Sequence, residues 1–117
     1  MIKQYSTTAE IKTASQICLQ HRLHEPMGSM RTWYMYSEQY IEELFIYYRY
    51  NRPVGAFALL KENGFGAYYN CGTCIRMEYR NRGYGKRLVN FVKEKGIEIK
   101  PWTGSQTARQ FYNKVLN

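Results

Sequence analysis

The fold is decided by the stretch Ile75-Arg76-Met77-Glu78-Tyr79-Arg80-Asn81-Arg82-Gly83-Tyr84-Gly85-Lys86-Arg87-Leu88. It passes from an extended run into a turn with two glycines, and then into a helical pattern. Amide N–H groups at a helix start have no partner inside the helix, and they lie at the positive end of its dipole. The stretch therefore predicts a site for a pyrophosphate group, which glycine allows the backbone to approach closely.

Basic side chains gather around this turn, and a single acidic residue, Glu78, opposes them. The basic residues are Arg76, Arg80, Arg82, Lys86 and Arg87. The whole chain has 17 Lys and Arg residues against nine glutamates, a formal net charge of +8, which favours a phosphate-rich cofactor or a polyanion as partner. On spacing alone a simpler interpretation stays open, in which the glycines only shape a tight turn and the basic residues are solvated.

The remaining sequence predicts a mixed α+β fold in the order α, α, β, β, β, α, β, α. Thr7 and Glu10 have the spacing of a capping box that opens the first helix. We predict helices over residues 8–22 and 84–95, a short helix opened by Ser37, and a last helix introduced by Gly104 and Ser105. We predict strands over residues 44–50, 54–60, 65–77 and 97–102, with a turn over residues 51–53.

Length and composition predict one domain over residues 1–117, because 44% of the residues are hydrophobic and can bury one core. No stretch has the pattern of a signal peptide or a membrane span, so a cytoplasmic location is expected. The three cysteines, Cys18, Cys71 and Cys74, lack a second Cys or His pair that would complete a zinc site. No metal is expected.

Two motifs resemble those of the GNAT superfamily of N-acetyltransferases. Residues Arg80-Asn81-Arg82-Gly83-Tyr84-Gly85 match the family's R/Q-x-x-G-x-G/A signature, and residues 75–79 are similar to the end of its fourth strand. The family's second motif is similar to Ser105, Ala108, Phe111, Tyr112, Asn113 and Lys114. The resemblance covers residues 44–117 and implies a mostly antiparallel, twisted sheet flanked by helices.

The resemblance implies that acetyl coenzyme A (acetyl-CoA) is bound as co-substrate. Its pantetheine arm would pair with the strand, its pyrophosphate would rest on the turn amides from Asn81 to Lys86, and Arg82 or Arg87 would meet the ribose phosphate. Ser105 stands where many relatives have an asparagine near the pantetheine. The implied cofactor-binding residues are Cys74, Ile75, Arg76, Met77, Arg80, Asn81, Arg82, Gly83, Tyr84, Gly85, Lys86, Arg87 and Ser105.

The implied reaction is direct attack of a primary amine on the thioester. By the resemblance, Tyr112 would protonate the departing sulfur, although Tyr112 could instead be core packing beside Phe111. Residues 65–77 contain no carboxylate, whereas many relatives have a glutamate there that acts as base. The candidates for the base are a water chain or one of His21, His24, Glu25, Glu38, Glu42 and Glu43.

Other functions stay open from the sequence. The chain ends after the second motif, whereas typical relatives continue into two more strands, so an open sheet edge could support a homodimer or a binding module without catalysis. A nucleic-acid partner, or a transfer RNA as acceptor, is compatible with the charge. Basic residues outside 76–87, such as Arg49 and Arg52, are scattered along the sequence, which weakens that alternative.

Overall fold

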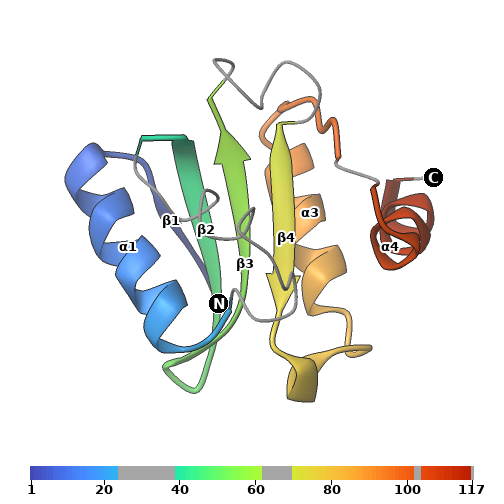
Figure 1. Ribbon diagram of the computed structural model, residues 1–117, viewed down its shortest axis with the longest axis horizontal. Coiled ribbons are helices and arrows are strands. Elements are labelled where there is room, and N and C mark those ends of the chain that lie inside the picture. The colour runs from blue at the N-terminus through green and yellow to red at the C-terminus, as the bar shows by residue number, and fades with distance from the viewer. Residues whose placement is uncertain (24–38, 62–69, 102–103, 117) are drawn as a thin grey trace.

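A computed structural model describes residues 1–23, 39–61, 70–101 and 104–116. Four strands form one antiparallel sheet in the order β1-β2-β3-β4 (Figure 1). They are β1 (Ile2–Tyr5), β2 (Ile41–Arg49), β3 (Arg52–Leu60) and β4 (Cys71–Ile75). The described part of the chain therefore has the predicted mixed α+β class with an antiparallel sheet.

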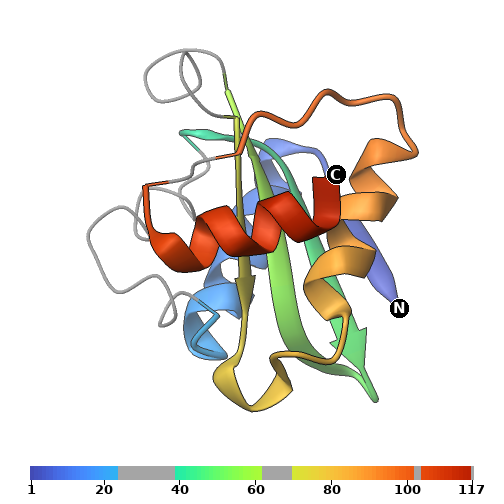
Figure 2. The same cartoon turned by 90° about the vertical axis from the view of Figure 1, so that its right-hand side faces the viewer.

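The helices cover both faces of this sheet. Helix α1 (Thr8–Gln20) lies on one face, while α3 (Tyr84–Lys93) and α4 (Gln106–Leu116) lie on the other. Figure 2 shows α4 crossing the side of the molecule next to β4. A short 3-10 helix, η3 (Met77–Tyr79), links β4 to the turn before α3.

Alternation along the strands divides the core into two clusters. On β2, Leu44 and Ile46 pack toward α1, while Phe45 packs toward α3. Successive side chains of a strand point to opposite faces, so one strand supplies both clusters. The central strand β3 is accordingly buried along most of its length.

Helix α1 begins at the predicted capping box. The Thr7 hydroxyl accepts the Glu10 N–H at 3.1 Å, and the Glu10 carboxylate accepts the Thr7 N–H at 3.0 Å. These backbone hydrogen bonds lower the pKa of Glu10. No helix in the described ranges combines the length and the apolar character needed to cross a membrane.

The first half of the predicted order needs three corrections. Strand β1 was missed, because its four residues become a strand only by pairing with β2 at the sheet edge. The hairpin turn consists of Tyr50 and Asn51, so Arg52 and Pro53 belong to β3; Pro53 lies beside a register shift in β2, where a missing N–H is tolerated. The helix predicted from Ser37 begins outside the described residues, and by Ile41 the chain is already in β2.

The second half agrees better, with two differences. The third predicted strand is shorter than expected, since within the described residues it spans Cys71–Ile75, and residues 65–69 lie outside them. The strand predicted over 97–102 is reduced, in its described part, to one parallel bridge between Cys71 and Pro101. Helix α3 ends close to Gly96, whose φ of +79° favours glycine, as the sequence predicted.

Candidate active site

The turn between η3 and α3 presents backbone amides to solvent. Asn81 and Gly83 both have positive φ, 62° and 85°, and such turns point neighbouring N–H groups into one concavity. Among the described residues, the amides of residues 81–86 have no hydrogen-bond acceptor, and the first amide to find one is that of Arg87, which donates to the Gly83 carbonyl at 3.0 Å. We call residues 81–86 the amide cradle.

Gly83 and Gly85, the two glycines of the cradle, have different structural roles. Gly83 needs its left-handed backbone, and an added Cβ there would meet no atom within 4 Å, so the space above it is open. At Gly85 an added Cβ would stand 2.8 Å from Phe111 Cε1. Gly85 therefore allows α4 to pack against the first turn of α3, while Gly83 shapes the cradle.

Three of the five basic side chains predicted around the turn, those of Arg82, Lys86 and Arg87, lie at the cradle. Arg82 and Lys86 are exposed on it, and Arg87 Nη1 donates to the Tyr47 hydroxyl at 2.9 Å. Arg76 is drawn away, because its guanidinium binds Glu78 at 2.6 Å. Arg80 Nε donates to the Ile75 carbonyl at 3.4 Å and so faces the end of β4.

Strand β4 has one edge with unpaired backbone groups. The Arg76 N–H donates to the Val54 carbonyl, so alternation directs the backbone of Cys74 toward β3 as well. The backbone groups of Thr73 and Ile75 point the other way. In the described residues, both Thr73 backbone groups and the Ile75 N–H lack a partner. The resemblance implied pantetheine contacts for Cys74, Ile75, Arg76 and Met77. Of these, Ile75 lies on the open edge, Cys74 and Arg76 face β3, and Met77 lies in η3; Thr73 was missed.

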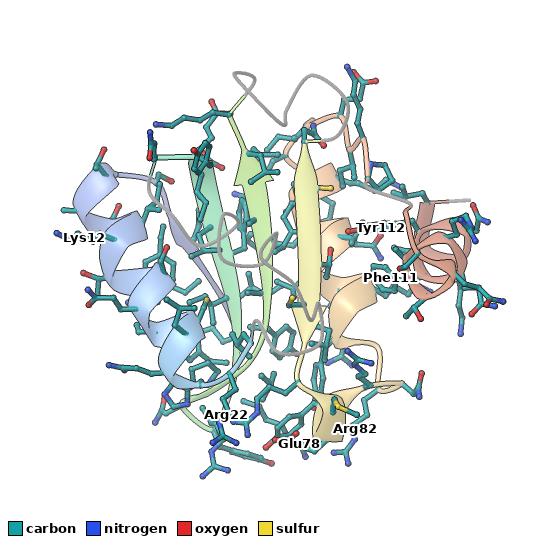
Figure 3. The ribbon with its side chains drawn as sticks, in the orientation of Figure 1. Lys12, Arg22, Glu78, Arg82, Phe111 and Tyr112 are labelled. Atoms are coloured by element: carbon teal, nitrogen blue, oxygen red, sulfur yellow. The ribbon has the colours of Figure 1, made fainter. Side chains whose placement is uncertain are left out.

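Tyr112 reaches β4 from α4, as Figure 3 shows. Its side chain is only 6% exposed, and its hydroxyl lies 2.9 Å from Thr73 Oγ1. Burial raises the pKa of Tyr112 well above its usual range, and the nearby Cys71 raises it further. The phenol is thus held protonated beside the open edge, and it also packs against the Phe111 ring at a centroid distance of 4.9 Å.

The sequence model of the Acetyltransferase (GNAT) domain matches residues 41–115. The chain belongs to the GNAT acetyltransferase family. Two solved structures have a similar fold, and both are complexes of meta-AAC0020, an aminoglycoside acetyltransferase from an uncultured soil metagenomic sample. The trehalose complex is 16% identical and the sisomicin complex 15%; each has a TM-score of 0.60, with all of this chain and 87% of that chain covered. No curated protein matches the chain significantly.

The GNAT match identifies an N-acetyltransferase, and acetyl-CoA is the co-substrate that this family uses. Ser105, expected near the pantetheine, caps α4, since its hydroxyl accepts the Ala108 N–H at 3.1 Å. Its O–H hydrogen is not used in that bond. Asn70 holds the segment before α4 near β4 through its side chain, which donates to the Glu98 carbonyl and accepts the Lys100 N–H.

The described candidate bases lie on two different elements, α1 and β2. His21 ends α1, Glu42 is exposed on β2, and Glu43 accepts a hydrogen bond from Gln4. None of these three hydrogen-bonds to Thr73 or Tyr112. The other candidates, His24, Glu25 and Glu38, lie outside the described residues. Within the described ranges, no three His, Cys, Asp or Glu side chains gather as they would around a metal ion.

Proposed function

We propose that the protein transfers the acetyl group of acetyl-CoA to a primary amine by direct attack of the amine on the thioester. The observation that carries this proposal is the amide cradle of residues 81–86, whose unpaired N–H groups adjoin the open edge of β4. A pyrophosphate supplies the acceptors that those donors lack. A cytoplasmic location, a single domain and a homodimer stay predictions from the sequence.

The open edge of β4 has the donors and acceptors that an amide-containing arm such as pantetheine requires. Thr73 offers both backbone groups, and the Ile75 N–H is a further donor. We therefore assign the pairing to Thr73 and Ile75, in place of Cys74 and Arg76, whose backbones pair with β3. One of these edge N–H groups would also face the thioester carbonyl and stabilise the oxyanion that develops on it.

The chemistry then needs a hydrogen for the sulfur that departs. As the amine nitrogen bonds to the carbonyl carbon, the carbon–sulfur bond breaks and the sulfur takes its electron pair. Tyr112 is placed to donate a hydrogen bond to that sulfur in the arrangement in which the Thr73 hydroxyl donates to the phenol oxygen. Because burial raises the pKa of Tyr112, the phenol keeps its proton at neutral pH and is a weaker acid than a thiol. Its contribution is the hydrogen bond that stabilises the departing sulfur, and that sulfur then takes its proton from water. The proton that the amine loses passes to water.

The acceptor is proposed only as a primary amine of a small molecule or protein. The two similar structures are of an aminoglycoside acetyltransferase, which makes a polycationic amine one candidate. The net charge of +8 opposes it, because a polycation needs carboxylates to attract it. An acceptor screen should therefore compare sisomicin with a neutral amine and a lysine peptide.

Binding of acetyl-CoA, measured by calorimetry, tests the cradle. Gly83→Glu adds bulk and negative charge to the cradle and should abolish binding. Gly96→Glu is a matched control, because Gly96 also has positive φ and open space but lies beyond the other end of α3. Loss of binding in Gly83→Glu alone supports the proposal. Equal binding in both variants contradicts the cradle, and saturable binding without thiol release for any amine contradicts catalysis.

A further inference from the structure

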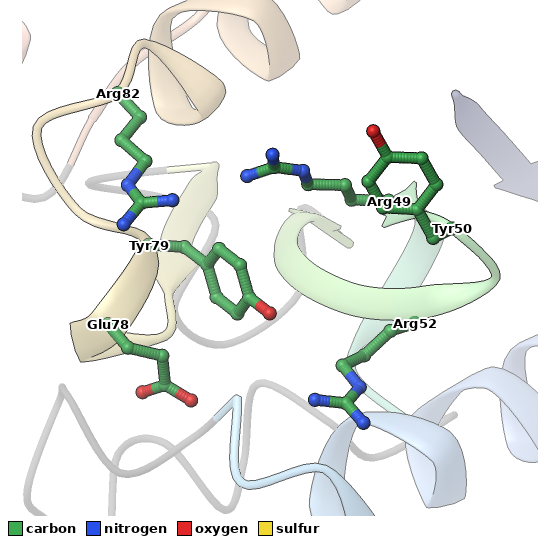
Figure 4. A pocket seen from close by; sticks show the side chains of 6 residues that line it. All are labelled: Arg49, Tyr50, Arg52, Glu78, Tyr79 and Arg82. Atoms are coloured by element: carbon green, nitrogen blue, oxygen red, sulfur yellow. The ribbon is translucent and has the colours of Figure 1, made fainter.

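A second basic site lies beside the cradle, between the tip of the β2–β3 hairpin and the η3 segment. It is an open pocket of about 500 Å³, which we call the hairpin pocket (Figure 4). Its lining consists of Arg49, Tyr50, Arg52, Glu78, Tyr79 and Arg82. The only acidic member, Glu78, is already paired with Arg76 at 2.6 Å. The three arginines therefore give the pocket a net positive charge.

The arginines are brought together by the fold and not by the sequence. Arg49 and Arg52 are directly opposite each other in the hairpin register, where like charges destabilise the pairing. Figure 4 shows Arg49 reaching from the hairpin toward the side of the pocket formed by Tyr79 and Arg82. Arg82 in turn extends from the turn before α3. An anion bound between these groups would relieve the repulsion.

Aromatic rings alternate with these charges. The Arg49 guanidinium lies 5.4 Å from the Tyr50 ring centroid, and that of Arg82 lies 5.6 Å from the Tyr79 centroid. The centroids of the Tyr79 and Tyr84 rings lie 6.3 Å apart. Tyr50 is exposed and Tyr79 partly exposed, whereas Tyr84 is buried. Cations beside accessible rings form the surface on which single-stranded nucleic acids bind, with phosphates on the cations and bases on the rings.

Tyr50 has a backbone conformation that is rare for a residue with a large side chain. Its φ is +50° and that of Asn51 is +63°, the pattern of a two-residue type I′ turn, which favours Asn and Gly. A tyrosine there is strained, and its side chain is also 90% exposed. Apart from its contact with Arg49, the Tyr50 ring is open to solvent and is available to a ligand.

We propose that the hairpin pocket binds a single-stranded nucleic acid. Arg49, Arg52 and Arg82 contact its phosphates, and the bases stack on Tyr50 and Tyr79. This function is additional to acetyl transfer and does not rest on it. An acidic peptide would use the charges but not the rings. The pocket shares Arg82 with the cradle, whereas Arg49, Tyr50, Arg52 and Tyr79 lie outside the cradle.

The test measures fluorescence anisotropy of a labelled single-stranded RNA of about ten nucleotides, the length range that one such site covers. The double variant Arg49→Ala/Arg52→Ala should weaken binding at least about tenfold and reduce the slope of log affinity against log salt by about 1.4, roughly 0.7 for each lost phosphate contact. The double variant Lys12→Ala/Lys93→Ala removes the same charge from exposed positions outside the pocket. Equal weakening by both pairs would overturn the proposal, because net charge alone would explain it.

Further comparisons distinguish ring stacking from charge attraction, and RNA binding from acetyl-CoA binding. Tyr50→Leu should weaken RNA binding about fivefold or more, whereas Tyr50→Phe should retain it, since stacking needs only the ring. Polyglutamate that binds as tightly as RNA of matched charge would overturn the assignment in favour of an acidic peptide. A third outcome would show that the pocket serves the coenzyme instead. In that case saturating acetyl-CoA abolishes RNA binding, and Arg49→Ala/Arg52→Ala weakens acetyl-CoA binding.

Discussion

Gly85 lies so close to Phe111 that any side chain at position 85 would collide with the ring: a Cβ would stand 2.8 Å from Cε1 and 2.9 Å from Cζ. This approach fixes α4 against the first turn of α3, and α4 carries Tyr112. The distance between the cradle and the phenol is thus set by a residue that is itself in the signature motif.

Replacing this glycine should therefore lower stability through Phe111. Gly85→Ala adds a steric cost of about 1–3 kcal/mol, which the better helix propensity of alanine offsets by about 1 kcal/mol at most. In a Phe111→Leu background the cost should shrink, and urea unfolding of the four proteins of this cycle measures the coupling. Strictly additive effects would contradict the contact.

Thr73 should matter to turnover more than to binding of acetyl-CoA. Thr73→Val removes the hydroxyl that lies 2.9 Å from Tyr112 and keeps the backbone groups of the β4 edge. We expect kcat to fall roughly tenfold with little change in the Kd for acetyl-CoA, while Thr73→Ser retains activity and Tyr112→Phe loses about a hundredfold. A Thr73→Val enzyme with a normal kcat would show that Tyr112 does not need a hydrogen bond with Thr73.

Tyr112 should also make stability fall at alkaline pH. Its folded pKa is raised by burial, so its contribution is complete below pH ~10, the unfolded value, and is lost as pH rises toward the folded value. The free energy of unfolding should decline above pH ~10 by up to about 1.4 kcal/mol per pH unit from this group. Urea unfolding of the wild type and Tyr112→Phe between pH 8 and pH 11 would show a shallower decline in the variant; parallel curves would contradict the assignment.

One substitution in the strained turn should raise stability and weaken RNA binding. Tyr50→Asn places a residue suited to positive φ at the hairpin tip and should stabilise the protein by about 1 kcal/mol. The same change removes the exposed ring and should weaken RNA binding. Thermal unfolding and anisotropy on one preparation test both, and Asn51→Ala is the control that should destabilise. A Tyr50→Asn protein of unchanged stability would contradict the strain at this position.

Local patterns predicted the helices, because caps and apolar spacing lie within each segment. Thr7 and Glu10 define the start of α1, and Gly83 marks the turn before α3. Strand β1 could not be found in this way, since Ile2–Tyr5 acquires its conformation from β2, far along the sequence. The strand predicted over 97–102 is reduced to the bridge at Pro101 in its described part, because β-forming residues alone do not supply a continuous partner strand.

The cradle was predictable as a contiguous motif, whereas the groups around it were not. Thr73 became a candidate only when the register showed which backbone groups of β4 face outward. Arg49 and Arg52 looked scattered in the sequence, and only the hairpin brings them to the same pocket as Arg82. Their separation from residues 76–87 in the sequence therefore does not weigh against a nucleic-acid partner.

The unpaired edge of β4 also has a consequence for the protein's behaviour in solution. An exposed strand edge can pair with the edge of another chain, which is a common route to aggregation. A ligand that pairs with Thr73 and Ile75 would close that edge at the same time as it enters the active site. The unliganded protein should therefore aggregate more readily than the protein bound to its coenzyme.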